Sequence, residues 1–236
     1  MKKIFSLIVS LICIFTLSGC TKSKNDTDIL TFFNALNNSL QQDSATVKGS
    51  LTSDAGNESS IDELIQWNQT KSLQAMAKLS ISAGGNTMDD FLNFYLKDNK
   101  TYLNAMGTKT QSTVENLGLD PNTKLDRYNP FLSLSNEELC SFFTSSSVTG
   151  DTYTFEIDKN SLSRMMNSYN DVTVKNAQLV AEIKDGLIDS LWIRIDGSQS
   201  LAKNQEYKAT LDLNVSDYNK TKEISFPNDL DTYTKE

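Results

Sequence analysis

The chain has 236 residues, with 22 basic and 30 acidic side chains and a formal net charge of −8 at pH 7. This length can bury one substantial core, and the acidic balance gives no attraction for nucleic acid. The chain has no histidine, which excludes Ser-His-Asp and Cys-His catalysis and His-ligated metal sites. It also contains no phosphate-loop, nucleophile-elbow or zinc motif. We therefore expect no enzyme activity, no cofactor and no metal.

The first residues have the pattern of an export signal. Two lysines precede an apolar stretch, Ile4–Leu17, which as a helix would be about 21 Å long. A hydrocarbon core is about 30 Å thick, so the stretch indicates a signal peptide rather than a membrane-spanning helix. It ends in Leu17-Ser18-Gly19-Cys20, which resembles the lipobox of bacterial lipoproteins. The alternative is an ordinary secretory signal with an incidental cysteine.

The lipobox resemblance implies how the chain is processed and where it lies. It implies that residues 1–19 are a cleaved lipoprotein signal peptide and that Cys20 is acylated, with palmitate among the expected acyl chains. The lipid would anchor the chain to the extracytoplasmic face of the cell membrane, because two or more acyl chains hold a protein stably. Residues 20–27 are then the lipidated cysteine and a polar tether, and residues 28–236 are the folded domain.

Cysteine usage in the folded domain predicts no disulfide. Cys13 lies in the signal and Cys20 is expected to be acylated, so Cys140 is the cysteine that remains. Its apolar neighbours indicate a small buried side chain, and a reactive thiol is the alternative.

The first half of the domain begins with a helix and continues with strands. Apolar residues at helical spacing predict a helix over 28–42. Strands are expected over residues 45–51, 72–83, 91–96 and 100–106, the last two joined by a tight turn at Asp98-Asn99. Residues 61–68 are ambiguous, because Ser60 and Glu63 fit a helix capping box while Ile61, Ile65 and Trp67 also fit a strand. Residues 107–130 are expected to be a polar connection, with a short helix over 112–117.

The second half predicts two helices and a closing meander. A capping box at Ser135–Glu138 predicts a helix to about residue 145, and a strand over 150–157 separates it from a second helix over 158–169. Three strands over 177–183, 191–196 and 207–216 alternate apolar and polar residues, with a turn signal at Asp185-Gly186. Their apolar face needs helices to cover it. The expected fold class is α+β, with a single curved antiparallel sheet packed on a few helices.

The order of these elements resembles a known group of lipoproteins. The chain closes on a final strand followed by Asp217-Tyr218-Asn219 and Ile224-Ser225-Phe226-Pro227. This order resembles the half-barrel lipoproteins that include the carrier LolA, the mycobacterial LppX and LprG group, and a set from low-GC Gram-positive bacteria. The resemblance implies an apolar cavity between sheet and helices, and hence binding or carriage of a lipid. The alternatives are a protein-interaction or sensor module of the cell envelope, which would use the polar sheet face, and a hydrolase of envelope polymers.

Candidate cavity residues lie on the two predicted mid-chain helices. They are large and apolar, and methionine adapts well to irregular ligands: Phe142, Phe143, Met165, Met166 and Tyr169. Ordinary core packing is the alternative for the same side chains. The acidic clusters at Asp89-Asp90, Glu137-Glu138 and 229–231 match no calcium-loop spacing, so we expect them to be structural or solvated. Arg194 is expected on the polar face of its strand.

Overall fold

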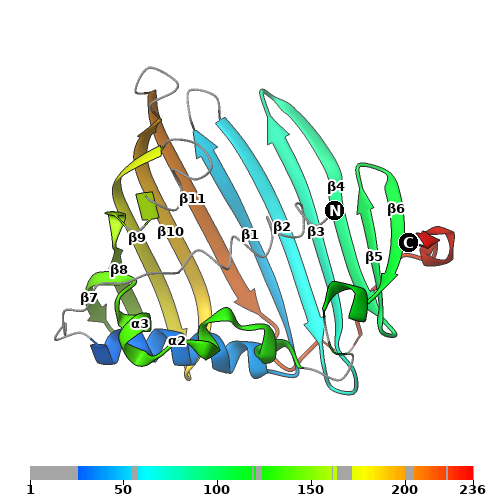
Figure 1. Ribbon diagram of the computed structural model, residues 1–236, viewed down its shortest axis with the longest axis horizontal. Helices are drawn as coiled ribbons and strands as arrows, with labels where there is room; N and C mark the ends of the chain where they lie inside the picture. The colour runs from blue at the N-terminus through cyan, green and yellow to red at the C-terminus, as the bar shows by residue number, and fades with distance from the viewer. Residues whose placement is uncertain are drawn as a thin grey trace.

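The computed structural model describes residues 26–54, 58–118, 120, 124–160, 162–163, 172–199, 205–221 and 223–235. Most of these residues belong to one sheet of 12 strands (Figure 1), in the order β12-β6-β5-β4-β3-β2-β1-β11-β10-β9-β8-β7. Every neighbouring pair is antiparallel except the short β12, which pairs parallel with β6.

The elements have the following bounds in chain order. The strands are β1 (Ser44–Asp54), β2 (Glu58–Asn68), β3 (Gln74–Ala83), β4 (Asn86–Lys97), β5 (Lys100–Ala105), β6 (Thr108–Thr113), β7 (Phe143–Thr149), β8 (Thr152–Ile157), β9 (Val172–Lys184), β10 (Leu187–Gln199), β11 (Gln205–Ser216) and β12 (Thr234–Lys235). The helices are α2 (Asp26–Gln41) and α3 (Asn136–Cys140), with 3-10 turns η1 (Glu115–Leu117), η2 (Leu125–Tyr128), η3 (Pro130–Ser133) and η5 (Leu230–Thr232).

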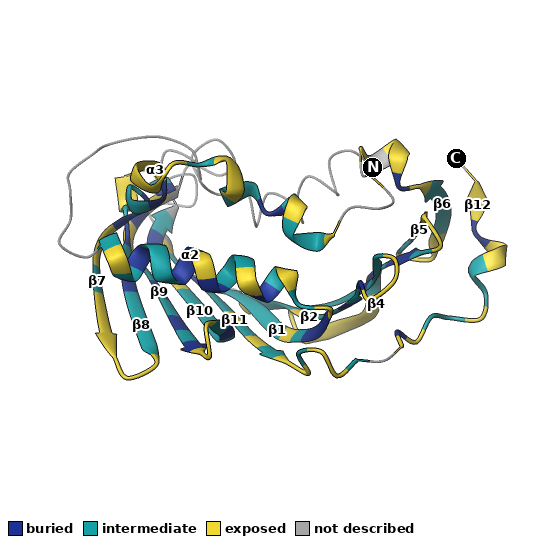
Figure 2. Ribbon diagram, turned by 90° about the horizontal axis from the view of Figure 1, so that it is seen from below, coloured by how far each residue is buried: buried dark blue, intermediate teal, exposed yellow. Residues whose placement is uncertain are grey.

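The sheet is open and curved. Figure 2 shows it along an edge, with α2 and the segment from η2 to α3 on the concave side and the C-terminal segment on the convex side. The expected fold class is therefore confirmed: one curved antiparallel sheet packs on a few helices. Among the described residues, none of the helices combines the length and the hydropathy of a membrane span.

Helix α2 covers one half of the concave side. It contacts β7, β8, β9 and β10, and its apolar stripe is buried against them. Phe155 on β8 is fully buried there, with its ring centroid 5.4 Å from that of Phe32 and 4.8 Å from that of Phe143. The Ser39 hydroxyl accepts a hydrogen bond from the Ile188 amide at 2.9 Å. This bond fixes the C-terminal part of α2 at the start of β10.

A second core lies on the convex side. Met76, Tyr95 and Tyr102 project from β3, β4 and β5, and the C-terminal segment covers them with Ile224 and Tyr233. The rings of Tyr102 and Tyr233 meet edge to face at a centroid distance of 5.6 Å. The segment ends as β12, which pairs with β6 and extends the sheet edge.

Three sequence predictions about elements are resolved or corrected. Residues 61–68 form a strand, because β2 pairs along its whole length with β1 and β3. The helix predicted to residue 145 is too long: the Ser135–Glu138 capping box is present, but α3 ends at Cys140 and Phe143 begins β7. The predicted short helix over 112–117 is wrong at its start, because residues 108–113 form β6 and only η1 is helical.

Candidate functional site

The strands that α2 leaves uncovered carry a continuous apolar surface on the concave side. In one cross-strand row Leu211 pairs with Leu51, Leu51 with Ile61, and Ile61 with Ile81. A parallel row runs from Val47 across β2, β3 and β4 to β5. We call this surface the concave apolar face, and its half-buried members are Val47, Leu51, Ile61, Ile65, Ala77, Leu79, Ile81, Phe94, Leu103, Leu211 and Leu213.

The concave apolar face differs from the two cores in its packing. None of its members belongs to either core cluster. On the same side of the sheet, Ile193 and Leu191 lie beside Leu211 and Leu213 but pack against the α2 cluster. A contiguous apolar surface that stays partly open to water commonly marks a binding site. The sheet thus continues one apolar face beyond the helix that covers it.

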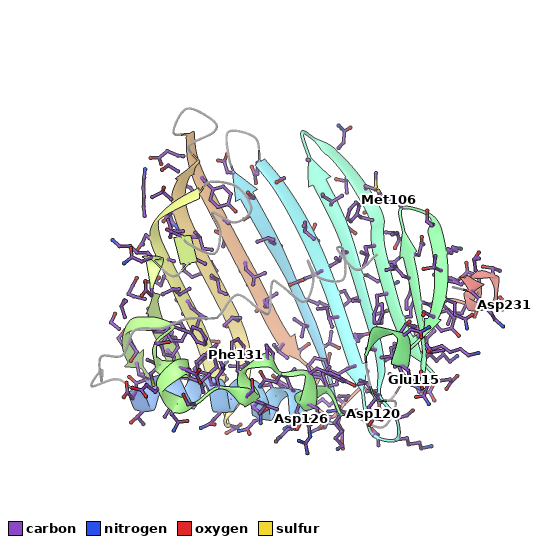
Figure 3. The ribbon with its side chains drawn as sticks, in the orientation of Figure 1. Met106, Glu115, Asp120, Asp126, Phe131 and Asp231 are labelled. Atoms are coloured by element: carbon purple, nitrogen blue, oxygen red, sulfur yellow. The ribbon has the colours of Figure 1, made fainter. Side chains whose placement is uncertain are left out.

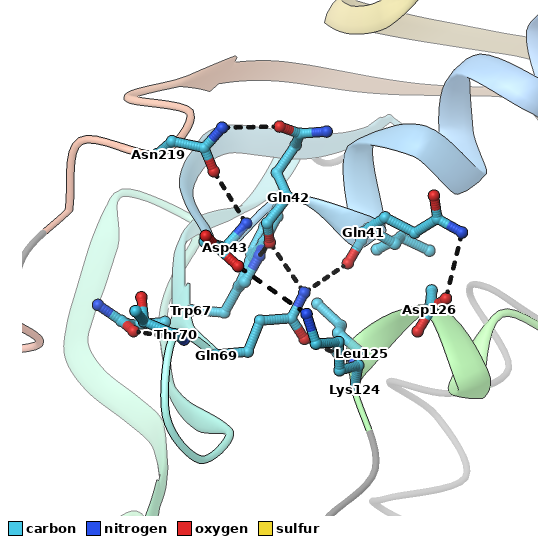
Figure 4. Close-up of polar contacts among 12 residues, drawn as sticks. Gln41, Gln42, Asp43, Trp67, Gln69, Thr70, Lys124, Leu125, Asp126 and Asn219 are labelled. Atoms are coloured by element: carbon cyan, nitrogen blue, oxygen red, sulfur yellow. Dashed lines mark hydrogen bonds and ion pairs between the residues drawn. The ribbon is translucent and has the colours of Figure 1, made fainter.

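A buried amide closes the end of this face that lies next to α2. Gln69 is 3% exposed, and its side-chain nitrogen donates to the carbonyls of Leu40 at 2.9 Å and Gln42 at 2.8 Å. Its side-chain oxygen accepts from the Leu125 amide at 2.7 Å, and the Trp67 indole also donates to the Gln42 carbonyl at 3.2 Å. Figure 4 shows how these bonds tie the end of α2, the end of β2 and the start of η2 together.

The opposite end of the face carries exposed methionines. Met88 is 49% exposed and lies opposite Ile81 in the β3–β4 register. Met106 is 65% exposed and lies in the turn between β5 and β6, at the end of the sheet far from α2 (Figure 3). Apolar surface therefore reaches the rim at the end where the described helices do not close the sheet.

Among the described residues, Glu63 is the one ionisable residue that the register places among the side chains of the concave apolar face. Its cross-strand neighbours are Gly49 on β1 and Leu79 on β3. Along β2, Ile61 and Ile65 share its face. Burial raises the pKa of Glu63, and no described residue forms a hydrogen bond or ion pair with its carboxylate.

Gly49 brings a further apolar side chain to Glu63. A Cβ at Gly49 would lie 2.5 Å from Leu213 Cδ2 and 2.1 Å from the Asp212 carbonyl oxygen. Glycine is therefore required where β1 and β11 approach each other, and Leu213 occupies the space beside it. The aliphatic neighbours of Glu63 across the sheet are therefore Leu79 on β3 and, beyond Gly49, Leu213 on β11.

The residues proposed from sequence lie in different places. Phe142 and Phe143 are 7% and 5% exposed in the α2 cluster, where their ring centroids lie 6.0 and 6.1 Å from that of Phe33. Met165, Met166, Tyr169 and the lipobox with Cys20 lie outside the described residues. A ligand-lining role for these residues stays a prediction. The sequence-based proposals did not include Glu63. The signal that could have indicated it is its position two residues from both Ile61 and Ile65, which places the three side chains on one face of a strand.

The free thiol of Cys140 is shielded. It is half-buried, and burial together with the Asp26 carboxylate raises its pKa to about 11. A thiol with such a pKa is protonated at neutral pH and is a poor nucleophile.

The acidic clusters have local partners. Hydrogen bonds from the amide and hydroxyl of Ser135 lower the pKa of Glu138, and a hydrogen bond from Lys109 lowers that of Asp229. Asp90 accepts from the Asn93 amide at 3.0 Å. Among the described residues, no group of three or more acidic, cysteine or histidine side chains could hold a metal ion.

Arg194 lies on the polar face of β10. It is exposed, and its Nε lies 3.1 Å from a carboxylate oxygen of Asp196, two residues along the same strand.

Comparisons with known proteins give distant structural likenesses. No family model matches the chain, and no curated protein matches it. LprF from Mycobacterium bovis is similar over 87% of this chain and 97% of its own, with 13% identity and a TM-score of 0.43. A domain described as an outer membrane lipoprotein-sorting protein, from Vibrio parahaemolyticus, is similar over 88% of this chain and 98% of its own, with 8% identity and a TM-score of 0.32. Both TM-scores are low, so the function proposed below rests on the residues of this chain.

Proposed function

We propose that this chain is a lipoprotein held at the extracytoplasmic face of the cell membrane through acylated Cys20, and that its concave apolar face binds a lipid or another long-chain apolar ligand. The observation that supports binding is the run of half-buried aliphatic side chains across β11, β1, β2, β3, β4 and β5, outside both core clusters. We further propose that Met165, Met166 and Tyr169 border the ligand, whereas Phe142 and Phe143, which are buried in the α2 cluster, pack the core beside the ligand.

The energetics favour an extended apolar ligand over a small polar one. Complete burial of a Leu, Ile or Phe side chain contributes about 1.5–3 kcal/mol. The side chains of the face are half-buried, so a ligand that covers them gains on the order of 1 kcal/mol from each. Several such contacts must add up before they exceed the entropy cost of association, and a small polar molecule would make too few of them.

Native mass spectrometry tests this proposal on the chain from Thr21 to Glu236. Both core clusters and all described strands lie within residues 26–235, so this chain retains the whole described fold. We expect a stoichiometric lipid to remain bound after purification without detergent, and organic extraction would identify it. A ligand-free mass that does not change after incubation with membrane lipids would contradict the proposal and favour a protein-interaction module that uses the polar convex side of β9, β10 and β11.

A pair of neighbouring substitutions locates the ligand. Leu79→Asn puts an amide on the concave apolar face, whereas Ser80→Asn puts the same amide on the convex side one residue along β3. We expect the first variant to lose most of the bound lipid and the second to retain it. Equal retention by both variants would place any bound lipid elsewhere on the protein.

A further inference from the structure

Glu63 is a charged residue within an otherwise apolar row of the concave apolar face. The register flanks it with Gly49 and Leu79, and the charged residues nearest to it in the strands, Lys48, Asp62 and Lys78, alternate with this row and so lie on the convex side. No cation among the described residues therefore faces its carboxylate. Partial desolvation by apolar neighbours is unfavourable for an ionised group to which the protein supplies no hydrogen-bond donor.

We infer that the ligand of the concave apolar face has a head that donates hydrogen bonds and carries no negative charge, an alcohol or an amine, and that Glu63 binds this head. The inference rests on the proposed function, because it specifies the chemistry of the ligand that this face would hold. An ionised carboxylate accepts hydrogen bonds only. A hydroxyl or ammonium head would supply the missing donor, whereas a carboxylate or phosphate head would bring a like charge to the same place.

The placement of Glu63 suits the head of an amphiphile whose chain lies on the face. Aliphatic side chains continue from it in both strand directions, to Ile61 and Ile65, and across the sheet to Leu79 and Leu213. A chain attached at the head would therefore contact apolar surface throughout. Charge complementarity at one point and apolar contact elsewhere together select a neutral or cationic amphiphile.

Three probes with the same chain length separate the head chemistries. Monolaurin has hydroxyl donors, dodecylamine has an ammonium group, and laurate has a carboxylate; each is titrated into the chain from Thr21 below its micellar concentration at neutral pH. A hydrogen bond to a charged group contributes about 1.5–3 kcal/mol. We therefore expect monolaurin and dodecylamine to bind about tenfold or more tightly than laurate. The two favoured probes also reveal whether the head is an alcohol or an amine.

Two substitutions with the same change in charge test the role of Glu63. Glu63→Gln keeps the shape of the side chain and removes its charge, whereas Asp62→Asn does the same at the exposed neighbour on the convex side. We expect Glu63→Gln to reduce the binding preference for monolaurin and dodecylamine over laurate to about threefold or less. We expect Asp62→Asn to leave this preference unchanged. Glu63→Gln should also raise the midpoint temperature of unfolding without ligand, because the unpaired charge is removed.

The outcomes distinguish the inference from the proposed function. If none of the three probes binds, the proposed function fails. If all three bind but laurate binds as tightly as the others, or if Glu63→Gln leaves the preference unchanged, the face binds amphiphiles and the role of Glu63 is wrong. If Glu63→Gln does not fold, Glu63→Leu, which suits the aliphatic surroundings, replaces it in the same comparison of probe binding.

Discussion

At the scale of single residues, Gln69 joins three segments that are distant in the chain. Its amide bonds to Leu40, Gln42 and Leu125 are 2.7–2.9 Å long and shielded from water. Gln69→Leu would leave the Leu125 amide and the Leu40 carbonyl without partners. We expect the free energy of unfolding to fall by about 2–3 kcal/mol, since a buried unpaired group costs about 1–3 kcal/mol. Urea titration followed by circular dichroism measures this loss.

Gln41 supplies the control for Gln69. Its amide is exposed and donates to Asp126 at 3.3 Å, so Gln41→Leu should change the free energy of unfolding by no more than about 0.5 kcal/mol. Equal losses in the two variants would show that burial of the Gln69 amide is not what stabilises this junction.

The turns could be predicted from sequence residue by residue, but Glu63 could not be assigned. Asp98 and Asn99 have φ of 51° and 58°, and Asp185 and Gly186 have φ of 53° and 73°, as the tight-turn prediction requires. Glu63, in contrast, fits two local patterns, the end of a capping box and the apolar phase of a strand. Only the pairing of β2 with β1 and β3 decides between them, and pairing depends on residues far away in the chain.

At the scale of elements, the C-terminal segment stabilises the half of the sheet that α2 leaves uncovered. Ile224 is 6% exposed and packs with the convex-side residues Met76 and Tyr95. We expect Ile224→Ala to lower the free energy of unfolding by about 2–4 kcal/mol, as truncation of buried aliphatic side chains does. Chemical unfolding of the chain from Thr21 measures the change.

Met106 is the matched control for Ile224. It is also a large aliphatic side chain, but it is 65% exposed, so Met106→Ala should change the free energy of unfolding by less than about 0.5 kcal/mol. A small effect at both positions would mean that the C-terminal segment is dispensable for the stability of the sheet.

Elements with strong local periodicity were predicted correctly, and elements set by distant partners were not. The helical stripe of α2 and the alternation of β9, β10 and β11 are visible in the sequence and confirmed. Strand β6 is polar and shows no alternation of burial, so its pairing with β5 could not be foreseen. Helix α3 has a correct start because its cap is local, but its end depends on Phe143 pairing with Ile157 of β8.

At the scale of the whole molecule, the sheet has two apolar sides that are covered in different places. The sequence predicts one apolar and one solvated face, which holds for β9, β10 and β11. It does not predict that β3, β4 and β5 carry Met76, Tyr95 and Tyr102 on the other face, covered by residues more than a hundred positions later. Because the C-terminal segment covers the convex side, the concave side of the same strands is left available as the concave apolar face.

The tyrosines of the convex core and of the α2 junction predict loss of stability at alkaline pH. Burial is the main cause that raises the pKa of Tyr95 and Tyr218 to about 12 and also raises the pKa of Tyr102 and Tyr233. The unfolded chain releases these protons near pH 10, its ordinary value, while the folded chain retains them. The free energy of unfolding is therefore unaffected by these groups below about pH 10 and falls between about pH 10 and 12.

Phenolate absorbance and circular dichroism, recorded together during an alkaline titration, test this prediction. We expect part of the tyrosine signal to appear only as the native circular dichroism is lost, because the buried hydroxyls ionise on unfolding. Tyr218→Phe removes the hydroxyl that donates to the Ile188 carbonyl at 2.6 Å. That variant should be less stable at neutral pH but lose less stability on going to alkaline pH. Complete ionisation of all tyrosines near pH 10 with an unchanged native spectrum would contradict the burial of these hydroxyls, and with it the covering of the convex face by the C-terminal segment.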